Sequence, residues 1–272
     1  MDAATADRQA DQQDGALARA LRYLVRVPFL LLHLFVGLPL AVLCCAFPGV
    51  RDWRIGDDTL RGLAIRRWSK TLCRIFGMRV QRLGDLHDDP VMLLANHVTW
   101  MDIEVLHAIR AIGFVAKAEI KGWPVIGWLA TIGGTVYHAR GSRSSQEAVS
   151  GALTERLVSG RSVAIFPEGR TSTGEEILPF HGRLIKAAVD ADCPVQAIAI
   201  GYFRNGELRN HEVAFGHREN FLQNFFRLLG MRTLDVDIVC MPAMETHGRG
   251  RKELAALARE QVVEALESRD AT

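Results

Sequence analysis

The feature that most restricts the fold of this chain is an uncharged stretch of 21 residues near its N-terminus. The stretch extends from Val27 to Phe47, and its sequence is VPFLLLHLFVGLPLAVLCCAF. At a rise of about 1.5 Å per residue, a helix of this length just crosses a hydrocarbon core of about 30 Å. Because a fold exposed only to water cannot easily accommodate such a segment, we expect an apolar anchor attached to a separate globular domain.

The chain divides into three segments of different character. Residues 1–18 start as a polar stretch rich in Ala, Asp and Gln, and we expect a disordered tail there. Residues 19–50 contain the apolar stretch and form the predicted membrane-anchoring segment. Residues 51–272 have the mixed polarity of a globular domain. The full chain of 272 residues, 49% apolar and 24% charged, is long enough for one such domain with a sizeable core.

Two interpretations of the apolar segment fit the sequence equally well. A single transmembrane span fits its length. A helix pair lying in one leaflet fits the interruptions at Pro28, Gly37 and Pro39, and the presence of His33 inside the stretch. A cleaved signal peptide fits poorly, because the stretch is long and lacks a clear A-x-A site before a soluble start.

Basic residues flank the apolar stretch on both sides. Arg19, Arg22 and Arg26 precede it, and residues 51–82 contain nine Lys or Arg against three Asp. This bias favours the cytoplasmic face of the inner (cell) membrane and contact with anionic lipids. Four of the residues also fit the polar face of an amphipathic helix: Arg66, Arg67, Lys70 and Arg74. The net charge of +2 gives no reason to expect nucleic-acid binding.

Short apolar runs alternate with helical periods after residue 82. The predicted strands are 91–95, 114–117, 162–166, 195–201 and 234–240. The predicted helices are 102–110, 146–157, 184–190 and 252–267. This alternation predicts an α/β fold, with a mixed central sheet flanked by helices and an N-terminal membrane-associated helical segment.

The five cysteines show no pattern of a metal or disulfide site. None belongs to a C-x-x-C pair and no histidine cluster accompanies them: Cys44, Cys45, Cys73, Cys193 and Cys240. We therefore expect single thiols in a reduced compartment, and no metal ion.

One motif carries the residues best suited to proton transfer: Asn96-His97-Val98-Thr99-Trp100-Met101-Asp102. It follows the predicted strand 91–95, and α/β folds place their sites at the carboxyl ends of strands. A turn into a helix lets Asp102 hold one ring nitrogen of His97 and leaves the other nitrogen to accept a proton. A structural interpretation competes, because Thr99-x-x-Asp102 also matches a helix capping box.

A second motif follows another predicted strand: Phe166-Pro167-Glu168-Gly169-Arg170-Thr171-Ser172. Gly169 permits a tight turn with exposed N–H groups, and Arg170 offers a forked donor to an anionic oxygen. As an isolated tripeptide, Pro-Glu-Gly is more typical of an ordinary turn.

Two further cations follow predicted strand ends. Lys117 stands in Lys117-Ala118-Glu119, and Arg140 stands in Tyr137-His138-Ala139-Arg140-Gly141. Each is individually more typical of a solvated surface. Between them, residues 122–129 have the sequence GWPVIGWL. Such a segment suits either a core or a membrane surface that guides an acyl chain.

In this order the motifs resemble those of the glycerolipid acyltransferase family, which includes 1-acyl-glycerol-3-phosphate and lyso-ornithine lipid acyltransferases. The resemblance extends from about Arg66 to Leu266. It implies an O-acyltransferase that moves a fatty acyl chain from acyl-carrier protein or acyl-coenzyme A to the hydroxyl of a lysolipid. It also implies that the reaction uses neither a metal nor another cofactor, and that membrane lipids surround the enzyme.

The resemblance also implies roles for individual residues. His97 would be the general base and Asp102 its partner, while Pro194 would open a fourth block near the acyl pocket. The substrate-binding residues would come from the first three blocks: Asn96, Lys117, Arg140, Glu168, Gly169 and Arg170.

Two departures from the family pattern affect the expected acceptor. The usual third block is E-G-T-R-S, whereas this chain exchanges Arg170 and Thr171. After Leu178-Pro179-Phe180 the family often has K-x-G, and here the sequence is His181-Gly182-Arg183. Lyso-ornithine lipid acyltransferases likewise lack the standard arginine. The expected acceptor is 1-acyl-glycerol-3-phosphate, giving phosphatidic acid, and lyso-ornithine lipid is the alternative.

Two other classes of protein fit the sequence less well. A hydrolase of acyl esters is disfavoured because the sequence contains no G-x-S-x-G elbow. A non-catalytic membrane adaptor is disfavoured because His97 and Asp102 are both present.

Overall fold

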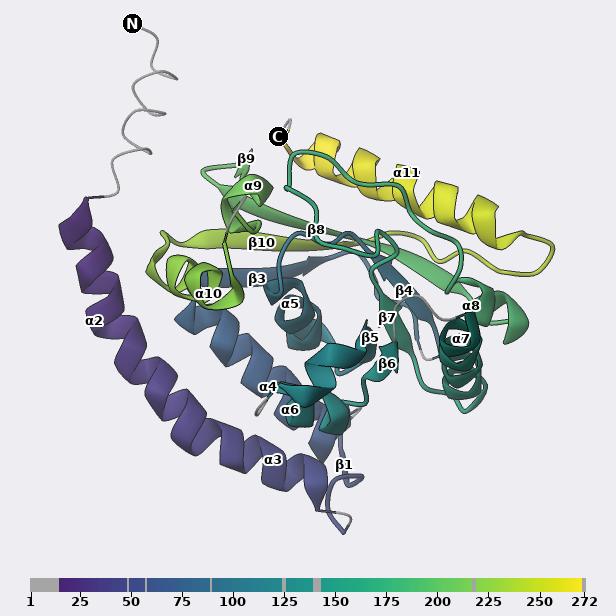
Figure 1. Cartoon of the computed structure of the whole chain (residues 1–272), viewed down its shortest axis with the longest axis horizontal. Coiled ribbons are helices and arrows are strands. Elements are labelled where there is room, and N and C mark those ends of the chain that lie inside the picture. Colours follow the sequence, from purple (N-terminus) through teal and green to yellow (C-terminus); the bar gives the residue numbers. More distant parts are fainter. Residues whose placement is uncertain are drawn as a thin grey trace, which may run out of the picture.

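The computed structural model describes residues 15–47, 49–56, 58–88, 90–123, 126–138, 143–216 and 219–270, in which an eight-stranded sheet is the central element. The strand order is β3-β10-β8-β4-β7-β5-β6, and β9 pairs with β8 (Figure 1). The strands are β3 (Met78–Leu83), β4 (Met92–Ala95), β5 (Gly113–Lys117), β6 (Val136–His138), β7 (Val163–Ile165), β8 (Val195–Arg204), β9 (Glu207–Leu208) and β10 (Leu234–Cys240). A separate two-stranded sheet pairs β1 (Arg54–Ile55) with β2 (Asp58–Thr59).

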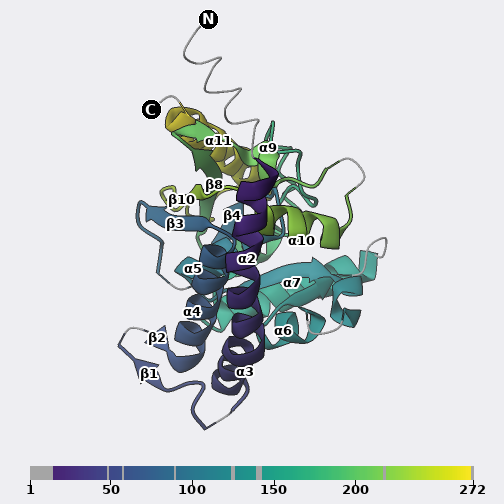
Figure 2. The ribbon, with the colours of Figure 1, turned by 90° about the vertical axis from the view of Figure 1, so that its left-hand side faces the viewer.

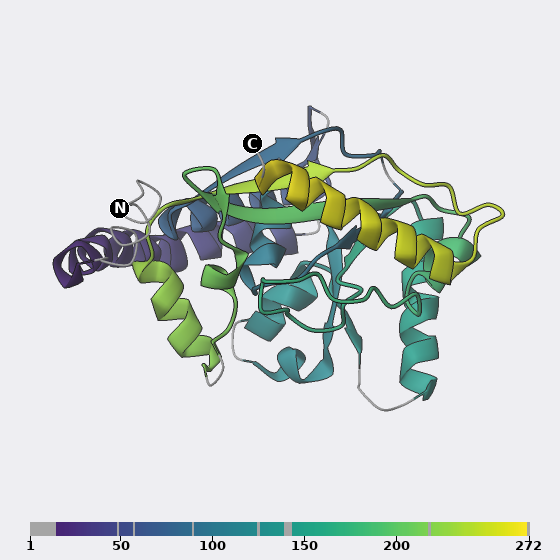
Figure 3. The same ribbon diagram turned by 90° about the horizontal axis from the view of Figure 1, so that it is seen from above.

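Helices cover both faces of this sheet, as Figure 3 shows from above. They are α4 (Leu60–Ile75), α5 (Met101–Ile109), η2 (Ala118–Gly122, a 3-10 helix), α6 (Ile126–Ile132), α7 (Arg143–Val158), α8 (Lys186–Asp190), α9 (Asn210–Val213), α10 (Phe221–Gly230) and α11 (Arg251–Asp270). The predicted α/β fold with a mixed central sheet is confirmed. All predicted strands and helices after residue 90 are present, and no end differs by more than three residues.

Most loops that carry predicted site residues emerge at one edge of the sheet, because the strands before them are parallel. β8, β4, β7, β5 and β6 are parallel to their neighbours in that order, and β10 is antiparallel to β8. The segments that follow these five parallel strands therefore emerge at the same edge, which we call the carboxyl edge. The motif of His97 follows β4 there, and the motif of Glu168 follows β7.

The core has two layers, one on each face of the sheet. Neighbouring residues of β4 alternate between them: Leu93 packs with α4, α5 and α10, while Leu94 packs with α7, α8 and α11. Every residue of β4 and β8 is buried, which explains why both strands are mostly apolar. Such a rigid double layer fixes where β4 and β8 end at the carboxyl edge.

The N-terminal apolar segment forms one long helix, Ala16–Ala46, and not a helix pair. It consists of α2 (Ala16–Leu32), a π-helical segment η1 (His33–Gly37) and α3 (Leu38–Ala46). The chain stays helical through Pro28 and Pro39, and the π turn between them accommodates the irregularity before Pro39. It is the one helix in the described residues that is long and apolar enough to cross a membrane, with a mean hydropathy of 2.4.

This N-terminal helix lies against the globular domain along α10 and α4 (Figures 1 and 2). His33 stacks on Trp68 of α4, with ring centroids 3.7 Å apart. Near the other end, Arg22 donates to the carbonyl of Gly230 and Arg26 donates to that of Leu229. Two of the basic residues expected to face lipid headgroups thus bind the carbonyl end of α10, where cations are favourable.

Candidate active site

His97 and Asp102 form a hydrogen-bonded pair at the carboxyl edge. The segment after β4, residues 96–100, which we call the histidine loop, turns into α5 and brings the two side chains together. Nδ1 of His97 lies 2.8 Å from Oδ2 of Asp102. Asp102 is fully buried, whereas the His97 side chain keeps 17% exposure. Since an ionised Asp102 only accepts, the neutral ring carries its proton on Nδ1, and Nε2 is left as a base.

The carboxylate of Asp102 accepts three more hydrogen bonds. Its Oδ2 accepts from the backbone N–H groups of Val98, at 2.7 Å, and Thr99, at 2.9 Å. Its Oδ1 accepts from the hydroxyl of Tyr202, at 2.6 Å. A fully buried carboxylate needs such donors to stay ionised, and it can then stabilise a protonated His97.

The structure resolves the competition between the capping box and the catalytic pair. Asp102 forms half of the box, since its side chain accepts from the N–H of Thr99. The other half is missing: Thr99 Oγ1 is buried without a partner in the described part of the chain, and the helix begins after Trp100 with no side-chain cap. Asp102 therefore orders the start of α5 and orients His97 with the same oxygen atom.

Asn96 joins the end of β4 to β8. Its side chain is fully buried, its Nδ2 donates to the carbonyl of Ile200, and its Oδ1 accepts from the N–H of Ile200. The side-chain amide thus continues the ladder that pairs Ala95 with Ile198. This contact holds the histidine loop in register, and the substrate contact expected of Asn96 stays a prediction.

Glu168 holds the main chain of His97. Its Oε1 accepts from the N–H of His97 at 2.6 Å, and its Oε2 accepts from the N–H of Leu178 at 3.1 Å. The N–H of Ser172 donates to the carbonyl of His97 at 2.7 Å. Burial raises the pKa of Glu168 to about 7, against the opposing effect of these N–H donors. Glu168 was predicted to bind substrate; here it is 4% exposed and contacts the protein interior.

Gly169 and Arg170 form the exposed tip of the same loop, residues 166–172, which we call the third-block loop. Gly169 has a φ of +72°, a left-handed conformation that glycine adopts without strain. The turn leaves the Arg170 side chain exposed, with no hydrogen bond or ion pair to any described residue. An exposed guanidinium on a loop that bonds to the main chain of His97 suits recognition of an anionic group on a substrate.

The predicted second block is only partly described. Lys117 is exposed at the end of β5, opposite His138 at the end of β6. Arg140 lies outside the described residues. The strand pairing does bring the ends of β5 and β6 together at the carboxyl edge.

The strand of the fourth block, β8, approaches the site with its carboxyl end and not with the end that carries Pro194. Pro194 precedes β8 and bonds to Met92, at the edge of the sheet opposite to His97. Pro194 lies there because β8 runs parallel to β4, and its expected place near the acyl pocket stays a prediction. The other end of β8 provides Ile200, which contacts Asn96 of the histidine loop, and Tyr202, which contacts Asp102 of α5.

Aromatic rings line one side of His97. The imidazole stacks on Phe166, with centroids 4.0 Å apart and planes at 14°, and Phe166 stacks on Phe114 at 5.8 Å. These rings restrict the rotation of the imidazole and shield one face of it from water. The geometry thus favours a ring of fixed orientation with Nε2 as its reactive atom.

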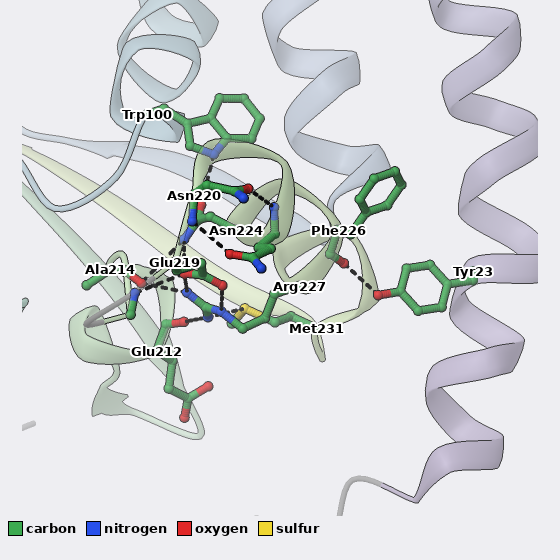
Figure 4. A network of polar contacts seen from close by, with 12 residues as sticks. Tyr23, Trp100, Glu212, Ala214, Glu219, Asn220, Asn224, Phe226, Arg227 and Met231 are labelled. Atoms are coloured by element: carbon green, nitrogen blue, oxygen red, sulfur yellow. Dashed lines mark hydrogen bonds and ion pairs between the residues drawn. The ribbon is translucent and has the colours of Figure 1, made fainter.

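Helix α10 supports the histidine loop from outside the sheet. Nε1 of Trp100 donates to Oδ1 of Asn224, and Nδ2 of Asn224 donates to Glu219 (Figure 4). Arg227 binds both oxygens of Glu219 and holds its pKa low, at about 2. Tyr23 of the N-terminal helix donates to the carbonyl of Phe226 (Figure 4). One helix therefore contacts both the histidine loop and the N-terminal helix, a connection that the sequence analysis missed.

The side chains at this edge suit proton transfer better than metal binding. No group of three or more His, Cys, Asp or Glu within the described ranges is arranged to hold a metal ion. The expectation of a reaction without a metal or cofactor stays a prediction.

Comparisons with known proteins agree with this geometry. Residues 77–201 match the model of the Acyltransferase family. The chain is 37% identical over 248 residues to the lyso-ornithine lipid O-acyltransferase of Pseudomonas aeruginosa, covering 90% of this chain and 94% of that protein. It is 36% identical over 167 residues to the 1-acyl-sn-glycerol-3-phosphate acyltransferase of Neisseria gonorrhoeae, covering 61% of this chain and 65% of that protein.

A solved structure shares the fold. The crystal structure of the 1-acyl-sn-glycerophosphate (LPA) acyltransferase PlsC from Thermotoga maritima superposes with a TM-score of 0.69. The match covers 93% of this chain and 98% of that protein at 20% sequence identity. At this identity the likeness extends to the fold, including the mixed sheet and its flanking helices.

Proposed function

This chain belongs to the acyltransferase family and is an O-acyltransferase, and we propose that it acylates the hydroxyl of a lysolipid at a membrane surface. The acyl donor in this proposal is a thioester of acyl-carrier protein or coenzyme A. One observation carries the proposal: His97 is bonded to buried Asp102 through Nδ1, which leaves Nε2 as a base.

The proposed chemistry is a direct transfer. Nε2 of His97 removes the proton of the acceptor hydroxyl, and the oxygen attacks the thioester carbonyl carbon. The tetrahedral intermediate collapses as the C–S bond breaks, and the leaving thiolate takes the proton from Nε2. A new ester C–O bond replaces the thioester, His97 returns to its neutral form, and no covalent acyl-enzyme is formed. Asp102 stabilises the imidazolium during these steps. This scheme needs no metal or other cofactor, because His97 carries the proton and the thiolate is the leaving group.

We propose lyso-ornithine lipid as the acceptor, which reverses the order expected from the sequence. The Pseudomonas aeruginosa relative, which matches nearly the full chain, is a lyso-ornithine lipid O-acyltransferase. In this chain the third-block arginine, Arg170, stands one position earlier than in the usual family pattern. Lysophosphatidic acid is the second candidate, supported by the Neisseria gonorrhoeae relative. Either lipid presents an anionic group, a carboxylate or a phosphate, that the guanidinium of Arg170 can bind.

The membrane part of the proposal rests on exposed apolar side chains. The N-terminal helix and α10 expose large apolar residues to solvent: Leu24, Phe29, Phe35, Leu40, Leu43, Leu222 and Phe226. Beside them, α4 exposes Arg67, Lys70 and Arg74, which suit anionic headgroups. We place the enzyme at the cytoplasmic face of the inner membrane, where acyl-carrier protein and coenzyme A thioesters are available.

An acceptor assay tests this function. The full chain, purified with lipid vesicles, is supplied with isotope-labelled acyl-carrier protein or acyl-coenzyme A and with either lysolipid. We expect a labelled diacyl product whose formation on lyso-ornithine lipid exceeds that on lysophosphatidic acid. Product on lysophosphatidic acid alone would overturn the acceptor assignment. Thioester hydrolysis without transfer to either lipid would overturn the proposed function as a whole.

A further inference from the structure

We propose that Tyr202 is a positioning residue for the His97–Asp102 pair, acting through the hydrogen bond from its hydroxyl to Asp102. The inference rests on the proposed function, since it assigns a role in the same active centre. Tyr202 lies on β8, separated by 100 residues from Asp102 in sequence, and both side chains are fully buried. Neither motif resemblance nor spacing in the sequence points to it.

The two oxygens of Asp102 have unequal sets of donors. Oδ2 accepts from Nδ1 of His97 and from the N–H groups of Val98 and Thr99, all in the histidine loop or next to it. Within the described part of the chain, Oδ1 accepts from Tyr202 alone. Tyr202 is thus the contact that fixes the second oxygen, and hence the plane of the carboxylate. Removing its hydroxyl leaves a buried anionic oxygen without a donor.

Tyr202 is itself held at both backbone groups. Its N–H donates to Oδ1 of Asn210 at 2.8 Å, and its carbonyl accepts from the N–H of Arg209 at 2.6 Å. It also lies opposite Val236 in the ladder between β8 and β10. Because strand and loop both fix its main chain, the hydroxyl cannot follow Asp102 if the carboxylate rotates. A donor so fixed determines where Asp102, and through it the imidazole, can lie.

The electrostatic setting keeps Tyr202 a donor. Burial and the neighbouring charge of Asp102 raise the pKa of Tyr202 well above its ordinary value, so the hydroxyl stays protonated. The other titratable groups that act on this cluster are Glu168 and Cys73. Burial raises the pKa of Cys73 as well, so that thiol stays neutral. The negative charges near His97 are thus that of Asp102, to which the Tyr202 hydroxyl donates, and that of Glu168 in its ionised form.

This arrangement predicts how the base strength of His97 depends on Tyr202. A hydrogen bond to Oδ1 spreads the negative charge of Asp102 and weakens its attraction for an imidazolium. Without the hydroxyl, the carboxylate attracts the protonated ring more strongly, so the imidazolium form of His97 is favoured. Since the base acts in its neutral form, the acidic limb of kcat/KM then moves to higher pH.

The test is Tyr202→Phe in the full chain, which keeps the ring and removes the hydroxyl. We expect kcat to fall about 10-fold, with the KM of the acceptor within about two-fold of its original value. We also expect the acidic limb of kcat/KM to move up by about 0.5 pH unit or more. Tyr23→Phe is the matched control: it removes a hydroxyl that also donates one hydrogen bond, but on the N-terminal helix.

A second measurement needs no substrate and separates this inference from the proposed function. The His97 ring is titrated by ¹⁵N NMR, with its signal assigned by its loss in His97→Gln. An upward shift of the His97 pKa in Tyr202→Phe supports the inference even if the original protein acylates neither lysolipid. An unchanged titration overturns it. A loss of kcat that follows a loss of thermal stability, with an unchanged pH profile, also overturns it.

Discussion

The histidine loop and the third-block loop lie at the same edge of the sheet, yet their functional side chains are held in opposite ways. Asp102 is fully buried and accepts four hydrogen bonds, and His97 bonds to it and stacks on Phe166. Arg170 is exposed and bonds to no described residue. In the proposed function the fixed pair determines the type of reaction, whereas the exposed arginine leaves room for variation in the acceptor. The difference explains why acyl transfer follows from the structure more directly than the acceptor does.

The largest effect is expected where the side chain is most constrained. Replacing His97 by Ala should lower kcat/KM at least about 100-fold on every acceptor, because the general base is lost. Asp102→Asn is the companion variant, and it should fall nearly as far, since an amide no longer stabilises the imidazolium. Steady-state kinetics with labelled thioester measures both. A His97→Ala enzyme that retains activity would refute the proposed base and remove the contrast between the two loops.

A selective effect is expected at the exposed arginine. Arg170→Ala should raise the KM for the anionic acceptor about 10-fold, because a charge-assisted contact is lost, while thioester hydrolysis changes much less. Arg161→Ala is a suitable control, since Arg161 is exposed and bonds to Ser159 in its own turn. Equal changes in transfer and hydrolysis would mean that Arg170 does not read the acceptor.

A smaller effect is expected at the outer support of the histidine loop. Asn224→Leu leaves the indole N–H of Trp100 without its acceptor and removes a donor to Glu219. We expect kcat to fall about 2- to 5-fold on all acceptors alike, with a lower melting temperature. Trp100→Phe tests the same bond from the other side. If Asn224→Leu changed the preference between acceptors, the histidine loop would contribute to specificity after all.

The smallest effect on activity is expected from the titration of Glu168, and it is best seen in stability. The pKa of Glu168 is about 7 in the fold and near its ordinary value in the unfolded chain, so the folded state holds the proton more tightly. The free energy of unfolding should therefore decrease as pH rises from about 4.5 to 7. Between these two pH values, the melting temperature of Glu168→Gln should fall about 4 °C less than that of the original protein. A parallel pH dependence of the two proteins would contradict this.

Much of the fold could be predicted, because local patterns determined it. The apolar runs of β4, β7 and β8 predicted buried strands, and the spacing of His97 and Asp102 predicted their contact. Several strands were missed, and two of them show why: β3 has exposed arginines and pairs at the sheet margin, and β9 has only two residues. Local sequence patterns cannot reveal a strand whose stability depends on pairing with its neighbour.

Other missed features depend on long-range contacts. Tyr202 meets Asp102 only because β8 pairs with β4 in one register, and Arg22 meets α10 only in the folded chain. Helix α10 did have a local signal, since Asn220 and Gln223 form a capping box. The acceptor remained open in the sequence because it depends on the exposed tip of the third-block loop, where packing imposes little.

The contacts between the N-terminal helix and α10 have a practical consequence for anyone preparing this enzyme. Arg22 and Arg26 occupy the carbonyl end of α10, and Tyr23 bonds to its last turn. A chain trimmed at residue 50 to improve solubility would uncover those carbonyls and weaken the helix that carries Asn224. The boundary between anchor and domain is thus a change in composition and not a suitable truncation site. We expect the smallest useful fragment of this protein to include its apolar helix.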